Sequence, residues 1–256
     1  MSELPPQGSS PTMTGGLRQP IVIIGGFLSS SALYLRMRDH LVARTGQPVS
    51  IVRIQSYDWL SAIVPVCWTR LLRQLGRAVN RAARDSVTGK VTLVGHSAGG
   101  ILARLYLSPE PFLGRSYRGL DYVDHLITLG SPHYNRRRWI YGGIMSQWVE
   151  KRQPGAFFAP QVQYTSVAGK LTRGDRHGSP RERRTFALYQ DMIGDGTVWG
   201  DGLIPVSAAL LHGSRHIVLE GVSHFVGFGG PWYGADNIIP RWLDCEHLDT
   251  TRAQAN

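Results

Sequence analysis

The chain has 256 residues, of which 42% are apolar and 18% are charged, a composition typical of one globular domain with a full core. No run of about 18 apolar residues occurs, which excludes a membrane-spanning helix. The formal net charge of +10 comes almost wholly from arginine, which favours carboxylates, phosphates or an anionic surface as neighbours. Because no nucleic-acid reader motif accompanies this charge, we expect no nucleic-acid partner.

Residues 1–18 are rich in Pro, Gly and Ser, and we expect a flexible lead-in to a single domain over residues 19–256. The lead-in lacks the apolar stretch of a secretory signal. The two cysteines, Cys67 and Cys245, fall in helical patterns and not at metal-ligand spacing. We therefore expect a cytoplasmic protein with no disulfide, metal or other cofactor.

Apolar runs alternate with helical patterns along the chain. Ile21–Ile24 predicts a buried strand, and Ser29–Ser31 offer N-caps for a helix through about Arg44. Trp68–Arg84 predicts an amphipathic helix whose arginines form the solvent face. Further strands are predicted at 50–54, 125–129, 161–168 and 216–220, loops at 55–65 and 170–184, and a closing helix at 237–247. This alternation implies an α/β protein with a mostly parallel sheet covered on both faces.

The most informative stretch is Lys90–Leu107, which predicts a buried strand, a very tight turn and a helix. Its centre, Gly95-His96-Ser97-Ala98-Gly99, fits the G-x-S-x-G pattern of a nucleophile elbow. Glycine at 95 and 99 removes side chains that would collide in such a turn. Ser97 is therefore the candidate nucleophile, and an ordinary strand-to-helix turn is the alternative.

A serine nucleophile needs a base, and histidine is the usual one. On an elbow scaffold the base comes from a loop after a late strand, in the chain order Ser, then Asp or Glu, then His. His224 follows the predicted strand 216–220, where a loop can carry it over the sheet edge. His216 should lie at the wrong end of that strand, and His212 precedes it in a turn. His224 is the predicted base.

The acid must stay ionised and hold the second ring nitrogen of the base, which favours a short carboxylate on a fixed turn. Asp195 and Asp201 each lie between two glycines. We prefer Asp201, because Leu203-Ile204-Pro205 follows it and can fix its turn. Asp195 stays the second choice, with a turn aspartate that caps its own backbone as the simpler reading. Glu220, inside a predicted strand, is discounted.

The oxyanion hole should combine the amide of Ala98 with an amide from the loop that leaves the first strand, for which Phe27 is the candidate. A plain glycine turn that feeds a helix explains Gly25 and Gly26 equally well. Residues 131–160 contain an aromatic, irregular insertion of the kind that forms a cap or lid. The pocket or lid residues proposed from it are Trp139, Tyr141 and Trp148. Packing of these aromatics against the core is the alternative.

The blocks IVIIGGFLSS, VTLVGHSAGG, LITLGSPH, GDGLIPVSAALLHGSRHIVLEGVSH and PWYGADNIIPRWL resemble the lipase and esterase branch of the α/β-hydrolase superfamily. The last two blocks are most similar to lipase-like hydrolases of plants and cyanobacteria. The resemblance implies an α/β-hydrolase fold, and the short lead-in limits the sheet to about six strands. Bacterial lipases carry their acid in a similar Asp-Gly-Leu turn a little over twenty residues before the histidine, which supports Asp201. Members commonly have histidine where Gly25 stands, and no counterpart of their calcium site is evident.

We therefore expect a serine carboxylic ester hydrolase, lipase-like, that acts through an acyl-enzyme on Ser97. An acyltransferase or thioesterase that uses the same three residues is one alternative. A non-catalytic module that binds lipid or a partner is another. The expected partners are an ester or lipid substrate and, through the basic surface, peripheral contact with an anionic membrane. The sequence does not indicate an oligomeric state.

Overall fold

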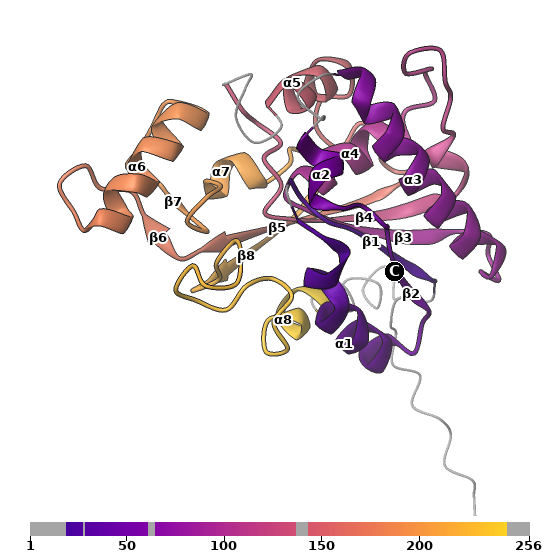
Figure 1. Ribbon diagram of the computed structural model, residues 1–256, viewed down its shortest axis with the longest axis horizontal. Helices are drawn as coiled ribbons and strands as arrows, with labels where there is room; N and C mark the ends of the chain where they lie inside the picture. Colours follow the sequence, from indigo (N-terminus) through magenta and orange to yellow (C-terminus); the bar gives the residue numbers. More distant parts are fainter. Residues whose placement is uncertain (1–18, 28, 61–64, 137–142, 245–256) are drawn as a thin grey trace, which may run out of the picture.

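Six parallel strands form the central sheet in the order β2-β1-β3-β4-β5-β8 (Figure 1). The computed structural model describes residues 19–27, 29–60, 65–136 and 143–244. The strands are β1 (Ile21–Ile24), β2 (Val49–Ile51), β3 (Val91–His96), β4 (Val123–Leu129), β5 (Gln163–Lys170) and β8 (Arg215–Glu220). Every neighbouring pair in this order is parallel. The predicted α/β class and six-stranded parallel sheet are confirmed.

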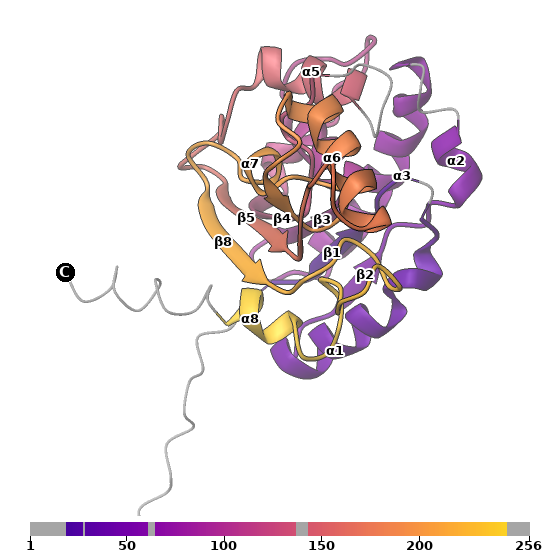
Figure 2. The same ribbon diagram turned by 90° about the vertical axis from the view of Figure 1, so that its left-hand side faces the viewer.

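Helices cover both faces of this sheet (Figures 1 and 2). One face carries α1 (Leu35–Thr45), which follows a short 3-10 turn at Ser31–Tyr34, and α8 (Ile239–Leu243). The other face carries α3 (Pro65–Arg84), α4 (Ala98–Leu107) and α5 (Gly143–Arg152). Every side chain of β1 and β3 is buried, because helices remove both faces of the central strands from water.

The apolar stripe of α3 packs against the sheet as its periodicity predicts. Trp68, Leu71, Leu72, Leu75 and Val79 are fully buried. The five arginines of the helix are exposed, namely Arg70, Arg73, Arg77, Arg81 and Arg84. At the end of the stripe Ala83 is buried and Ala82 is half-buried. The helix thus shields the apolar sheet and presents its charge outward.

A smaller subassembly lies beyond the β5–β8 end of the sheet (Figure 1). It contains α6 (Pro180–Ile193), α7 (Val206–Ala209) and an antiparallel pair of β6 (Thr172–Arg173) and β7 (Trp199–Gly200). Ser179 and Glu182 begin α6 with a capping box, and α6 ends at Gly194 in the left-handed conformation. This region carries Asp201 directly after β7.

Several predicted boundaries were wrong. The predicted loop 55–65 contains α2 (Ser56–Leu60), and the predicted loop 170–184 contains β6 and the start of α6. β2 ends three residues earlier than predicted. Among the described residues the closing helix spans only Ile239–Leu243. These elements are short or polar, so local apolar periodicity is weak there.

The predicted serine N-cap also differs in detail. Ser30 occupies the N-cap position of the 3-10 turn without a capping side-chain bond, and the Ser29 hydroxyl instead donates to Gly26 O at 2.7 Å. Cys67 is a free, half-buried cysteine in α3, and Cys245 lies outside the described residues, as does the lead-in 1–18. In the described segments we find no helix with the length and apolarity needed to cross a membrane.

Candidate active site

Ser97 lies at the apex of a sharp turn between β3 and α4. β3 ends at His96, α4 begins at Ala98, and Ser97 itself has φ of 56° and ψ of −129°. A serine rarely adopts positive φ, and this strain is typical of a functional turn. A Cβ at Gly95 would lie 2.5 Å from the Gly100 Cα, and one at Gly99 would lie 2.5 Å from Ile24 O. The two glycines of the motif are therefore needed for close backbone packing on either side of the serine.

The structure brings His224 to this serine from 127 residues further along the chain. His224 Nε2 lies 3.0 Å from Ser97 Oγ. The loop that follows β8 carries the histidine, and its backbone N–H donates to Asp201 O at 3.0 Å. The ring is fully buried, and Ser97 is 5% exposed. The serine hydroxyl and the imidazole are within the distance over which a proton can be transferred.

Asp201 lies on the other side of the imidazole, with Oδ2 2.7 Å from His224 Nδ1. Its Oδ1 accepts hydrogen bonds from the backbone N–H of Leu203 at 3.0 Å and of Ile204 at 2.7 Å. These bonds close the turn that the Leu-Ile-Pro sequence was expected to fix. The carboxylate is completely buried and hydrogen-bonded at both oxygens, so it can hold one tautomer of His224 with Nε2 free to accept a proton.

Tyr233 is a member of this site that the sequence analysis did not single out. Its hydroxyl donates to Asp201 Oδ2 at 2.8 Å and accepts from the Gly169 backbone N–H at 2.7 Å. Burial, followed by the nearby Asp201 carboxylate, raises the pKa of Tyr233 well above its ordinary value. The tyrosine therefore stays protonated and acts as a donor to the carboxylate. No local sequence signal marks it, because its partners are 32 and 64 residues away.

His96, which precedes Ser97, lies against the imidazole ring of His224. Its ring centroid is 4.9 Å from that of His224, and its Nε2 lies 3.2 Å from His224 O. A carbonyl can only accept, so Nε2 carries the proton and Nδ1 accepts from the Tyr34 hydroxyl at 2.8 Å. Burial, and then His224, hold the pKa of His96 well below its usual range. His96 is therefore a neutral support that fixes the backbone of the base.

Tyr34 links the same network to the loop that follows β1. Its hydroxyl accepts from the Gly26 N–H at 3.1 Å, and burial raises its pKa to about 12. A Cβ at Gly26 would lie 2.5 Å from Ser97 Cβ, so this loop runs against the nucleophile. Because Tyr34 occupies the Gly26 amide, the next amide, that of Phe27, stays the candidate oxyanion donor beside Ala98. The Ala98 amide lies at the first position of α4, where it has no acceptor within its own helix.

The second-choice acid Asp195 and the discounted residues make contacts other than with Ser97. Asp195 is exposed, and its Oδ1 accepts from Thr197 N–H at 2.8 Å and from the Thr197 hydroxyl at 2.7 Å. These bonds hold the pKa of Asp195 below its ordinary value, as in a turn aspartate. His216 Nε2 lies 2.8 Å from Leu211 O, and Glu220 pairs with Lys170 at 2.8 Å. His212 is exposed in the turn before β8.

Of the three candidate lid residues, Trp139 and Tyr141 lie outside the described residues. Trp148 lies in α5, half-buried, with its ring edge-on to Phe112 at 5.2 Å and the Arg152 guanidinium 4.1 Å above it. Phe112 belongs to the core, so Trp148 packs at the core boundary. A role for Trp148 in a substrate pocket stays a prediction. Among the residues described, no group of His, Cys, Asp and Glu side chains has an arrangement that could hold a metal ion.

Comparison with known proteins now adds to the geometry. A family model described as "PGAP1-like alpha/beta domain" matches residues 60–170, less than half of the 256-residue chain. The mature lipase BlEst2 of Bacillus licheniformis superposes with a TM-score of 0.50 at 19% identity, over 88% of this chain and 91% of the lipase. The chain has the α/β-hydrolase fold. The fold that the sequence resemblance implied is thereby confirmed.

Two further solved structures are similar to this chain. MenH from S. aureus has a TM-score of 0.45 at 13% identity, over 92% of this chain and 95% of that chain. The RedJ thioesterase from the prodiginine biosynthetic pathway of Streptomyces coelicolor has a TM-score of 0.44 at 13% identity, over 97% and 96% respectively. No curated protein matches the sequence. In this chain Ser97 follows β3 and His224 follows β8.

Proposed function

We propose that this protein is a serine hydrolase that cleaves carboxylic esters through an acyl-enzyme on Ser97. The observation that carries the proposal is the hydrogen-bonded chain from Ser97 Oγ through His224 to Asp201, with distances of 3.0 and 2.7 Å. The strained elbow adds to it, because it presents the hydroxyl beside the N-terminus of α4. The Bacillus licheniformis structure of the same fold is that of a lipase, which supports an ester substrate.

The acylation step follows from the hydrogen bonds of the three residues. Ser97 Oγ attacks the ester carbonyl carbon while His224 Nε2 takes the hydroxyl proton, and the carbonyl oxygen becomes an oxyanion. Asp201 stabilises the imidazolium through Nδ1, and the amides of Ala98 and Phe27 donate to the oxyanion. Collapse of the intermediate breaks the bond to the leaving alcohol, which receives the proton from His224.

Deacylation repeats the chemistry with water. His224, now neutral, takes a proton from a water molecule that attacks the acyl-Ser97 carbonyl. The second tetrahedral intermediate expels Ser97, which recovers its proton from His224, and the carboxylic acid leaves. His96 holds the carbonyl of the base, so we expect the ring to keep one position through both steps.

Labelling with a fluorophosphonate probe tests the nucleophile. The wild-type protein should be labelled, and Ser97→Ala should not. Ser116→Ala is the matched control, because Ser116 is exposed and its hydroxyl donates to the Pro109 carbonyl at 3.5 Å, its one hydrogen bond among the described residues. A Ser97→Ala protein that labels as strongly as the wild type would refute the proposal.

A panel of p-nitrophenyl esters of graded acyl length, run beside the matching thioesters, tests the substrate class. We expect ester turnover to fall on the order of a million-fold in Ser97→Ala. Adding an alcohol acceptor to the ester assay separates transfer from hydrolysis, since a transferase makes the new ester at the expense of free acid. Thioester turnover well above ester turnover, or acyl transfer in place of hydrolysis, would contradict the assignment as an ester hydrolase.

A further inference from the structure

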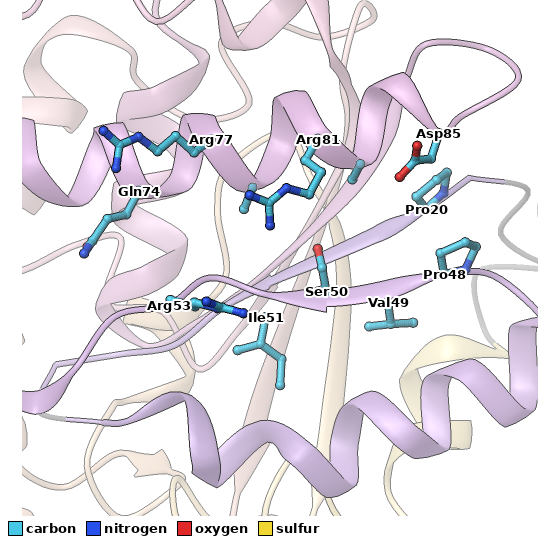
Figure 3. Close-up of a pocket in the computed structure, with 12 residues that line it drawn as sticks. Pro20, Pro48, Val49, Ser50, Ile51, Arg53, Gln74, Arg77, Arg81 and Asp85 are labelled. Carbon is cyan, nitrogen blue, oxygen red and sulfur yellow. The ribbon is translucent and has the colours of Figure 1, made fainter.

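A cavity lined by none of Ser97, Asp201 and His224 lies at the open edge of the sheet, between β2 and α3 (Figure 3). Its volume is about 360 Å³, within the range of small-molecule sites. Its apolar walls come from Pro20, Pro48, Val49, Ile51, Ala78 and Ala82. Pro20 and Pro48 precede β1 and β2, whereas Ser97 follows the other end of β3, so the cavity starts from the opposite end of the sheet.

Three arginines line this cavity: Arg53, Arg77 and Arg81. None of the three forms an ion pair with any residue that the structure describes. Arg70 on the same helix pairs with Asp58 at 2.8 Å, so the helix can satisfy its arginines where a carboxylate is near. The one acidic lining residue is Asp85. The cavity therefore has an excess of positive charge, and its three arginines have no counter-ion among the residues that the structure describes.

Two buried polar atoms in the lining also lack partners. The Ser50 hydroxyl and the Gln74 side-chain carbonyl have no hydrogen bond within the described part of the chain. In Figure 3 the Ser50 hydroxyl points from β2 toward Arg81. Native proteins satisfy nearly all buried polar groups, so an unsatisfied hydroxyl beside arginines that pair with no described residue indicates a missing acceptor. An oxyanion accepts from a hydroxyl and from guanidinium groups together.

A second cavity, of about 300 Å³, continues around β2 toward α1. It shares Arg53 and Arg81 with the first and adds Leu35 and Arg38. β2 is the edge strand, with β1 on its inner side only. The two cavities thus share lining residues along an open strand edge, and we call the residues that line either cavity the β2 groove.

We propose that the β2 groove binds a small amphiphile whose charged end is a phosphate monoester. Arg77, Arg81 and the Ser50 hydroxyl hold the phosphate, and the proline, valine and alanine surfaces take the apolar end. Three fixed positive charges suit a dianionic phosphate better than a single carboxylate. The proposal is independent of ester hydrolysis, because the β2 groove contains none of Ser97, Asp201 and His224.

Calorimetric titration with hexyl phosphate tests the site on the full chain. We expect a Kd below about 1 mM, with inorganic phosphate and hexanol each at least about tenfold weaker. The double variant R77Q/R81Q should lose at least about tenfold in affinity for hexyl phosphate. Ser50→Ala should lose a smaller factor while circular dichroism stays unchanged.

The matched control is R73Q/R84Q, which removes the same charge from the exposed face of the same helix outside the cavity lining. It should bind hexyl phosphate as the wild type does. Equal losses in the two double variants would mean non-specific attraction and would overturn the site. Equal binding of inorganic phosphate and hexyl phosphate would refute the claim that the ligand has an apolar end. No binding of hexyl phosphate to the full chain would refute both the amphiphile and the phosphate site.

Sedimentation with vesicles that contain phosphatidic acid identifies the source of the phosphate. Retention that R77Q/R81Q abolishes and R73Q/R84Q keeps would support a phosphate monoester presented on a membrane. Binding of hexyl phosphate without retention on vesicles would support a soluble ligand. Retention that both double variants lose equally would overturn specific recognition by the groove.

Discussion

The Tyr233 hydroxyl donates to the same oxygen of Asp201 that accepts from His224. Tyr233 is therefore the fourth hydrogen-bond partner of the Asp201 carboxylate, after the backbone N–H groups of Leu203 and Ile204 and the imidazole. The Gly169 N–H fixes the direction of the tyrosine proton, because the hydroxyl accepts that bond and must donate elsewhere. We infer that Tyr233 is a positioning residue, which acts on the reaction only through Asp201.

Tyr233→Phe should lower kcat for an activated ester by about tenfold and leave KM within about twofold, because the aligned carboxylate matters most in the transition state. It should also cost about 1–3 kcal/mol of folding free energy, since the Gly169 N–H loses its acceptor. Steady-state kinetics and urea unfolding measure the two effects.

Tyr189→Phe is the control for this substitution. The Tyr189 hydroxyl is likewise the acceptor for a backbone N–H, that of Gly202 at 3.0 Å, but it makes no hydrogen bond to the carboxylate among the described contacts. Tyr189→Phe should lower the free energy of unfolding by about as much as Tyr233→Phe does, with little loss of kcat. If the two phenylalanine variants lose kcat equally, the role assigned to Tyr233 is wrong.

Asp201→Asn should reduce kcat on the order of ten-thousand-fold, because an amide favours the wrong imidazole tautomer. Asp195→Asn should stay within about twofold of the wild type, since its exposed carboxylate bonds only its own turn. The comparison separates the two Gly-Asp-Gly sequences. Comparable losses in both variants would contradict the assignment of the acid.

Ser97→Gly should abolish ester turnover and raise the free energy of unfolding by about 1–2 kcal/mol. The reason is the positive φ of Ser97, which glycine adopts without strain. Ser97→Ala keeps the Cβ and should be equally inactive without this gain. Urea unfolding of both variants against the wild type measures the strain, and equal stability of the glycine and alanine variants would argue against it.

Folding stability should fall as the pH drops below about 6.5. Burial lowers the pKa of His125 to about 4 and holds the pKa of His133 well below its usual range. Each imidazole is neutral in the folded protein, whereas the unfolded chain takes up protons below its ordinary pKa near 6.5. The folding stability that these two neutral imidazoles contribute is therefore fully present above pH 6.5 and is lost progressively as the pH falls toward 4.

For His125 alone the shift corresponds to about 3 kcal/mol over that range. Urea midpoints at several pH values should show the decline, and His125→Asn should reduce the slope. His177→Asn is the control, because His177 is exposed. A flat stability profile between pH 7 and 5 would contradict the buried neutral state.

Local signals were sufficient for much of this fold. The elbow was evident because Gly95, Ser97 and Gly99 lie between a β-branched run and a helical pattern, all within one short segment. Asp201 could be separated from Asp195 because Leu203 and Ile204 supply the backbone donors that fix its turn. The elbow and the turn of Asp201 depend on residues that are close together in the sequence, so a local pattern can predict them.

The remainder depends on contacts between distant segments. Tyr233 gains its role only when the loop after β8 packs against β5, and His96 only when His224 closes over it. α6 was missed because it is polar and basic over its first turns, where the capping box of Ser179 and Glu182 is its clearest mark. The edge groove arises from the separation of β2 and α3, which no periodicity encodes.

The order of the site along the chain has a consequence for biosynthesis. Asp201 and His224, joined by a backbone hydrogen bond, both come after β5 in the sequence, and β8 is the last strand of the described sheet in chain order. A nascent chain that has already exposed its elbow outside the ribosome still lacks both partners of Ser97. The hydrogen-bonded chain from Ser97 through His224 to Asp201 can therefore form only after residue 224 has been synthesised.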